Sequence, residues 1–192
     1  LAAVEFHRGS PAAAESLYLE IRFEAHLLGQ SHLVAMIDQN LGAMANIRGD
    51  VDAAIHRYEA ALAHFESIGD AFATAGVLTN LGMAYVDVSE WSAAERCFDR
   101  ALALSERLEA ASLRGHIEIN RAELYARSRD TARAKDCCDR AFDLYGRIHS
   151  ESGLAETHKW YGVIYRDMAR GDLAETHLSA AVEIARGCDD RL

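Results

Sequence analysis

The chain has 192 residues with a net charge of −10, and half of them are hydrophobic. The only lysines are Lys135 and Lys159, and the other positive charges are arginines. An acidic surface without a basic stripe argues against binding to nucleic acid phosphates or an anionic membrane. No run of about 18 apolar residues is present, which argues against a membrane-spanning helix. A single proline and abundant alanine favour helices packed through small side chains.

Short motifs recur along the chain with a period of 40 residues. The copies are Asn40-Leu41-Gly42, Asn80-Leu81-Gly82, Asn120-Arg121-Ala122 and an altered Trp160-Tyr161-Gly162. Twelve residues after each small residue stands an alanine, and four residues later a bulkier side chain, as in Ala54 and Tyr58 or Ala174 and Leu178. A fixed period of this size is typical of a solenoid, in which each unit buries its apolar face on its neighbours.

The register predicts helices in chain order, with short turns between them. Pro11 suits the first turn of the earliest helix. The turns contain Gly, or Asp and Ser as caps, as in Arg48-Gly49-Asp50 and Arg129-Asp130. The predicted helices are 10–28, 31–47, 51–67, 71–88, 91–108, 111–128, 131–149, 152–169 and 173–186.

The motifs Leu81-Gly82-Met83-Ala84-Tyr85 and Ala94-Glu95-Arg96-Cys97-Phe98 resemble the two helices of a tetratricopeptide repeat. The period of 40 residues is similar to that of the long-repeat subclass, found in the polarity adaptor Pins/LGN, kinesin light chain and bacterial regulators. This resemblance implies an all-α fold, a right-handed α-solenoid of antiparallel helix pairs. It also implies a noncatalytic scaffold that binds a protein or peptide.

The expected organisation is one continuous domain of four repeats with a partial leading repeat. The partial repeat covers residues 1–30, and the full repeats cover 31–70, 71–110, 111–150 and 151–192. Leu1 to His7 align with the tail of a first helix whose front half is missing, so we expect a segment of a longer chain. Open solenoid ends also predict self-association through those ends.

Side chains three and four residues apart share one helix face, so the first helix of each repeat predicts a row of groove residues. In that architecture the first helices line the concave face. The predicted peptide-binding groove consists of Gln39, Asn40, Ala43, Thr79, Asn80, Met83, His116, Asn120, Glu123, Lys159 and Trp160.

Asn40, Asn80 and Asn120 occupy one position of the repeat, and two interpretations of them stay open. A side-chain amide has a donor and an acceptor, so a row of them can grip the backbone of an extended peptide. Such a row is similar to the asparagine ladder of O-linked N-acetylglucosamine transferase. Alternatively, each asparagine ties its own helix to the next by a bond to the backbone.

Trp160 replaces the asparagine in the fourth repeat and lies next to Lys159. A tryptophan on a groove can anchor an apolar or cationic group of a ligand. The alternative is that its indole packs against the neighbouring first helix as part of the core.

Neither catalytic nor metal-binding motifs are evident, so we expect no enzyme activity, no cofactor and no bound metal. Ala-Glu-Thr-His occurs twice, ending at His158 and His177, but a Glu and a His two residues apart diverge on a helix. The four cysteines follow no disulfide or ligand spacing, which favours buried thiols and a cytoplasmic location. Arginine in place of lysine and frequent alanine suggest a bacterial source.

The sequence thus favours a scaffold that captures a protein segment. A second hypothesis is a ligand-sensing or intramolecular regulatory region of a multidomain bacterial transcription or signalling protein.

Overall fold

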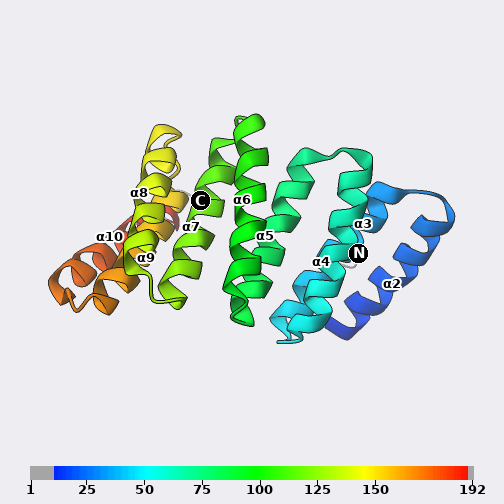
Figure 1. The fold of residues 1–192 in the computed structure, drawn as a ribbon, viewed down its shortest axis with the longest axis horizontal. Coiled ribbons are helices and arrows are strands. Elements are labelled where there is room, and N and C mark those ends of the chain that lie inside the picture. Colours follow the sequence, from blue (N-terminus) through cyan, green and yellow to red (C-terminus); the bar gives the residue numbers. More distant parts are fainter. Residues whose placement is uncertain (1–10, 190–192) are drawn as a thin grey trace. The chain divides into compact units, whose positions relative to one another are not determined.

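The computed structural model describes residues 11–189, and these form nine α-helices without a strand (Figure 1). The helices are α2 (Pro11–Leu27), α3 (Ser31–Ile47), α4 (Val51–Ile68), α5 (Ala71–Asp87), α6 (Trp91–Arg107), α7 (Ala111–Arg127), α8 (Thr131–Arg147), α9 (Glu151–Asp167) and α10 (Gly171–Asp189). Their ends lie within three residues of the predicted ones, and the all-α fold is confirmed. The expected half helix at Leu1 to His7 lies outside the described residues.

The chain divides into two compact units between Glu90 and Trp91. In the N-terminal unit, α3 packs against α2 and α4, and α5 contacts both α4 and α3. In the C-terminal unit, α7 packs against α6, α8 and α9, and α9 also packs against α8 and α10. Each unit therefore consists of antiparallel neighbours joined by tight turns (Figure 1).

The helices from α2 to α9 all end in the same way, because a residue with positive φ recurs every 20 positions. The N–H group after that residue donates to the carbonyl five positions back, as Asp50 does to Ala45 at 2.9 Å and Asp130 to Tyr125 at 2.8 Å. This is the Schellman arrangement, which satisfies the last carbonyls of a helix. The residues with positive φ are Gly29, Gly49, Gly69, Ser89, Glu109, Arg129, His149 and Ala169.

Small residues on one helix make room for large ones on the next, as the repeat pattern predicts. A Cβ atom on Gly42 would lie 2.7 Å from the Tyr58 ring, and one on Gly162 would lie 2.5 Å from Leu178. Real side chains do not approach so closely, so only glycine permits these helices to pack at this spacing. Ala54 and Ala61 are fully buried on the facing helix.

A buried ion cluster joins three helices of the N-terminal unit. The Asp38 carboxylate on α3 is fully buried, and its Oδ1 accepts from Arg22 Nε on α2 at 2.7 Å and from Arg57 Nη1 on α4 at 3.0 Å. The Asp38 bond is the largest cause of the raised pKa of Arg22. Forty residues later, the corresponding positions hold Leu62, Leu78 and Cys97. Three charged residues in one copy of the repeat therefore correspond to three apolar residues in the next copy.

We expect Asp38→Ala to lower the free energy of unfolding by about 2–3 kcal/mol, since it strands two guanidinium groups near the core. The value is below that for a fully buried pair because both arginine side chains are about one-third exposed. Replacing the whole cluster with the residues found 40 positions later, as Arg22→Leu, Asp38→Leu and Arg57→Cys, should recover most of the loss. Urea unfolding followed by circular dichroism measures both. A triple variant less stable than the single one would contradict this.

Ala169→Gly should stabilise the protein by about 1 kcal/mol, because an L-residue at φ 57° carries steric strain that glycine lacks. The reciprocal change Gly49→Ala, at φ 81° with open space around its Cα, should destabilise by a similar amount. Thermal unfolding of both variants provides the measurement. Shifts of the same sign in the two would show that backbone conformation does not dominate at these turns.

Candidate functional site

The first helices of the C-terminal unit, α7 and α9, bring five of the predicted groove residues to one region. The Asn120 amide lies 3.3 Å from His116 Nε2 on the same helix. On α9, Lys159 Nζ donates to Glu156 Oε1 at 2.5 Å and lies 5.6 Å from the centre of the Trp160 ring. The fifth residue, Glu123, is partly exposed on α7.

Trp160 is partly buried and packs against a hydrophobic cluster. The cluster contains Ile119, Ala141 and Tyr145, with Leu154 at its border. The indole therefore packs against the core, and the part of it that is exposed leaves some surface accessible. Both interpretations of this residue are compatible, since a tryptophan can fill a core with one edge and contact a partner with the other.

The electrostatic setting of this region is mixed. Desolvation lowers the pKa of His116, and the nearby Glu156 carboxylate partly offsets that effect. His116 on α7 is therefore within electrostatic reach of α9. A neutral imidazole next to an amide and within reach of a carboxylate can both donate and accept hydrogen bonds.

In the N-terminal unit, the predicted residues differ in accessibility. Asn40 is exposed, and its Nδ2 donates to the Tyr18 hydroxyl on α2 at 3.5 Å. Thr79 is 2% exposed, and its hydroxyl donates to the Ala75 carbonyl at 2.8 Å. Its side chain is therefore buried and does not form part of an exposed surface. The remaining residues of this set are partly exposed: Gln39, Ala43, Asn80 and Met83.

The side-chain amides of Asn40 and Asn120 form hydrogen bonds with other side chains. Asn40 bonds to a tyrosine hydroxyl on the preceding helix, and Asn120 bonds to a histidine one turn earlier. Both partners are side chains that can rotate away. Each amide thus keeps hydrogen-bonding capacity that a ligand can use.

An apolar groove of about 460 Å³ lies between α9 and α10. Leu178 and Val182 on its α10 side are 41% and 48% exposed, which is high for aliphatic side chains. Glu156 and Lys159 belong to the α9 side, so the groove continues into the region around Trp160. Sequence reasoning missed the α10 wall because it considered the first helices alone. The full lining is Ser152, Ala155, Glu156, Lys159, Leu178, Ala181, Val182 and Ala185.

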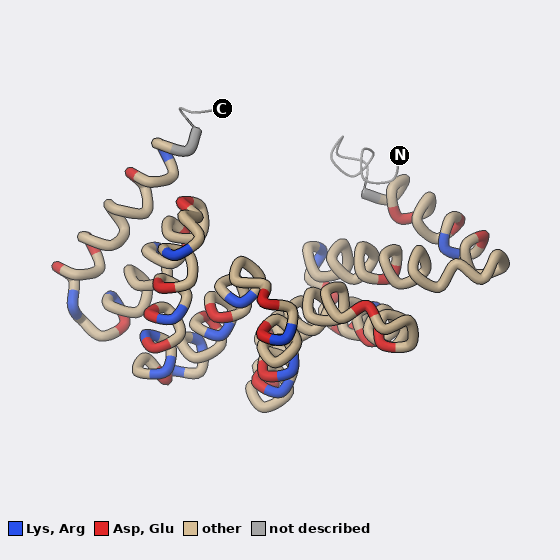
Figure 2. Tube along the Cα trace, turned by 90° about the horizontal axis from the view of Figure 1, so that it is seen from above, with Lys and Arg blue, Asp and Glu red and all other residues tan. Residues whose placement is uncertain are grey.

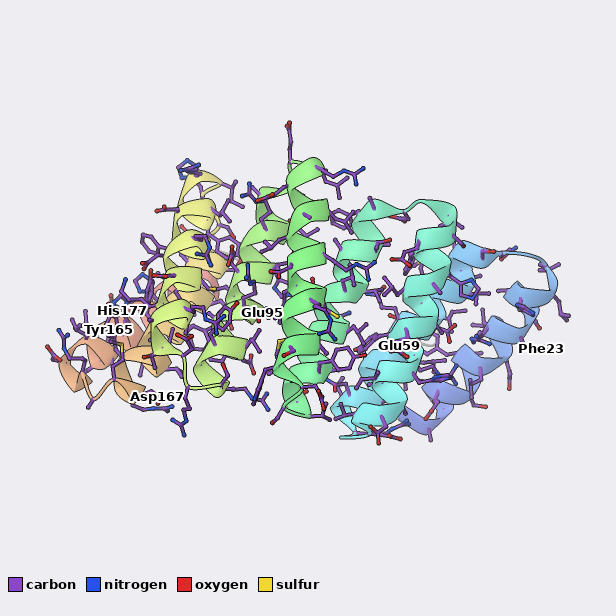
Figure 3. All side chains as sticks on the ribbon, viewed as in Figure 1. Phe23, Glu59, Glu95, Tyr165, Asp167 and His177 are labelled. Carbon is purple, nitrogen blue, oxygen red and sulfur yellow. The ribbon has the colours of Figure 1, made fainter. Side chains whose placement is uncertain are left out.

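A second cavity, of about 520 Å³, is lined by residues of α6, α7 and α8. The Tyr125 hydroxyl donates to Glu95 at 2.6 Å, and the Arg133 guanidinium lies 4.2 Å from the centre of the Tyr125 ring (Figure 3 labels Glu95). Arg133 also bonds to Asp130 and Glu95. The charges around this cavity therefore satisfy one another.

Two histidines that the sequence placed in separate motifs meet between α9 and α10. His158 Nδ1 lies 2.9 Å from His177 Nδ1. Figure 3 shows Tyr165 and His177 side by side, with ring centres 5.3 Å apart. The two histidines are 19 residues apart in the sequence, the same separation as Asp38 and Arg57, which also meet between a first and a second helix. That separation is the signal by which the sequence could have predicted the pair.

Charged side chains of both signs are spread over the helices. Figure 2 shows Lys and Arg interspersed with Asp and Glu along the helices. Among residues 11–189, no helix combines the length and apolarity that a membrane span requires. The same residues contain no group of three or more His, Cys, Asp or Glu side chains placed to hold a metal ion.

Comparison with known proteins supports the expected family. Residues 33–107 match a tetratricopeptide repeat model. The chain is similar to the crystal structure of BtubC (BKLC) from P. vanneervenii, with TM-score 0.84, 25% identity, and coverage of 98% of this chain and 78% of that one. No curated protein sequence matches it.

Two further solved structures share the fold at lower identity. A putative kinesin light chain from Podospora anserina, with nearly identical TPR-like repeats, has TM-score 0.76 and 13% identity, covering 97% of this chain and 92% of that one. MamA has TM-score 0.64 and 16% identity, covering 99% and 97%. The resemblance to the tetratricopeptide repeat family is therefore confirmed over residues 33–107, and the fold of the chain is that of the TPR-like α-solenoids to which it is similar.

Proposed function

We propose that this chain is a noncatalytic scaffold that binds a helical or extended segment of a partner protein. Tetratricopeptide repeats are in general protein-interaction scaffolds, and that role is common to the family. The observation that carries the proposal is the apolar groove between α9 and α10, bordered by Glu156 and Lys159. Exposed Leu178 and Val182 with a charged border suit an amphipathic segment.

The interior of the C-terminal unit supports a helix as the occupant. Ala141 and Tyr145 on α8 stand 40 positions before Ala181 and Ala185 in the groove. Both α8 residues are buried, and Gly153 of α9 lies directly against the Tyr145 ring. On α8, the positions that correspond to the groove residues of α10 are therefore covered by a helix, α9, which has a small residue at the point of contact. A partner helix with a similar apolar face would bury Leu178 and Val182 in the same way.

The α7 and α9 surface would extend the contact beyond the groove. Asn120 and His116 supply hydrogen bonds for a partner's backbone, and the exposed part of Trp160 supplies an apolar anchor. In the N-terminal unit, Asn40 and Asn80 would serve a separate contact of the same kind. Buried thiols at Cys137 and Cys138 support a cytoplasmic setting for this role.

Val182→Glu should weaken binding of a peptide, selected by display against this protein, by about tenfold or more, because it places a carboxylate in the apolar groove. Trp160→Ala should weaken the same peptide to a similar degree if the contact extends onto α9. Fluorescence anisotropy measures both affinities. Helicity at 222 nm should be unchanged for Val182→Glu, since that side chain is 48% exposed.

Arg147→Ala, an exposed position near the end of α8, is the matched control and should leave affinity within about twofold. If peptides bind equally well to all three variants, the groove and the α9 surface are not the binding site. If selection yields no binding peptide, the proposed function is wrong.

A further inference from the structure

His158 and His177 form a contact between α9 and α10 that depends on their protonation. Their Nδ1 atoms are 2.9 Å apart, a distance at which one nitrogen must donate and the other accept. When both imidazoles are neutral, one carries its proton on Nδ1 and the other presents a lone pair there. The pair closes one helix onto the next only in this state or with one added proton.

The second added proton removes the acceptor. The first proton goes to the free Nε2 atom of the donor ring, which leaves the bond intact and strengthens it by charge. The second must go to the accepting Nδ1, so that two N–H groups and two positive charges face each other. The two histidines therefore titrate as a coupled pair, and the contact is lost at the second step.

The surroundings of the pair disfavour positive charge. The rings of Phe142, Tyr161 and Tyr165 pack around it, with Tyr161 and His177 centres 4.7 Å apart. On α8, Lys135 lies within electrostatic reach of His177. The Asp139 carboxylate is engaged by Lys135 at 2.8 Å and by the Tyr161 hydroxyl at 2.5 Å. The facing titratable groups are thus Lys135 and Asp139 from α8, and Tyr161 and Tyr165 from α9.

The pKa values follow from this setting. Desolvation lowers the pKa of His158, and desolvation together with His158 and Lys135 lowers that of His177. A histidine whose pKa is lower in the folded state contributes stability that is complete above its unfolded value of about 6.5. That contribution is lost as pH falls through the folded-state pKa. The contact should therefore hold at neutral pH and fail under mild acid.

The corresponding positions in the other repeats do not hold a pair of histidines. In the first repeat these positions hold Asp38 and Arg57, which form an ion pair at 3.0 Å. In the second repeat they hold Leu78 and Cys97. In the third, Glu118 bonds to Arg140 at 2.8 Å next to the buried Cys137. The fourth repeat alone places two histidines there.

We propose that the facing His158 and His177 make a pH-sensitive latch, which holds α10 against α9 at neutral pH and releases it in mild acid. The latch is independent of the proposed binding of a partner. Release would open the groove wall formed by α10, so acid would alter that surface whatever occupies it.

Hydrogen exchange of α10, measured by mass spectrometry and corrected for intrinsic rates, tests the latch. Between pH 7.5 and 5.0, the protection factors of α10 should fall by about tenfold or more in the wild type. Copying the first repeat with His158→Asp and His177→Arg, or the second with His158→Leu and His177→Cys, should reduce that fall to about threefold or less. An unchanged wild type, or an equal fall in both folded double variants, would overturn the proposal.

An NMR titration of the wild-type imidazoles decides the matter even if the variants do not fold. The expected result is two coupled steps, with the second at a pH below the ordinary histidine pKa and accompanied by changes in α10 resonances. Two independent titrations near pH 6.5, without a response in α10, would rule the latch out.

Discussion

The left-handed residue at the end of each helix is the constraint on which the rest of this structure depends. Because it recurs every 20 positions, all helices from α2 to α10 begin at the same interval. A constant interval keeps each side chain in the same register on successive helices, so small residues meet large ones throughout. Glycine meets the requirement at Gly29, Gly49 and Gly69, whereas ordinary residues meet it in every later turn. The repeating packing therefore carries a backbone strain in its C-terminal part that the N-terminal part avoids.

The same pair of positions between a first helix and its second helix holds very different side chains in different repeats. Asp38 with Arg57 is charged and His158 with His177 is polar and neutral, yet both pairs join a first helix to its second helix. Buried polar groups are stable when each finds a partner, whatever the partner is. The scaffold can therefore change the pH response of a single helix pair without changing its fold.

The ends of the helices could be predicted to within three residues because the motifs and turns recur at a constant period. Gly42 and Tyr58 predicted a close contact, and the structure shows that even one added methyl group would collide there. The site was harder to predict, since exposure depends on what each helix packs against. Thr79 shares the helical face of its neighbours but is buried, and the α10 wall of the groove comes from a helix with no distinctive motif. The histidine pair was missed because its members lie 19 residues apart, so only the helix pairing brings them together.

The C-terminal unit concentrates the features that distinguish one repeat from the others. Trp160 replaces the recurring asparagine, His158 stands two positions before it, and Lys159 between them borders the α9 and α10 groove. Neighbouring residues on a helix point in different directions. His158 faces α10 while Lys159 and Trp160 lie toward the groove and the α7 side, so three consecutive residues contact three different surroundings. His158 and Lys159 are neighbours on α9. A change in the contact between His158 and α10 therefore acts on the same helix that places Lys159 at the border of the groove.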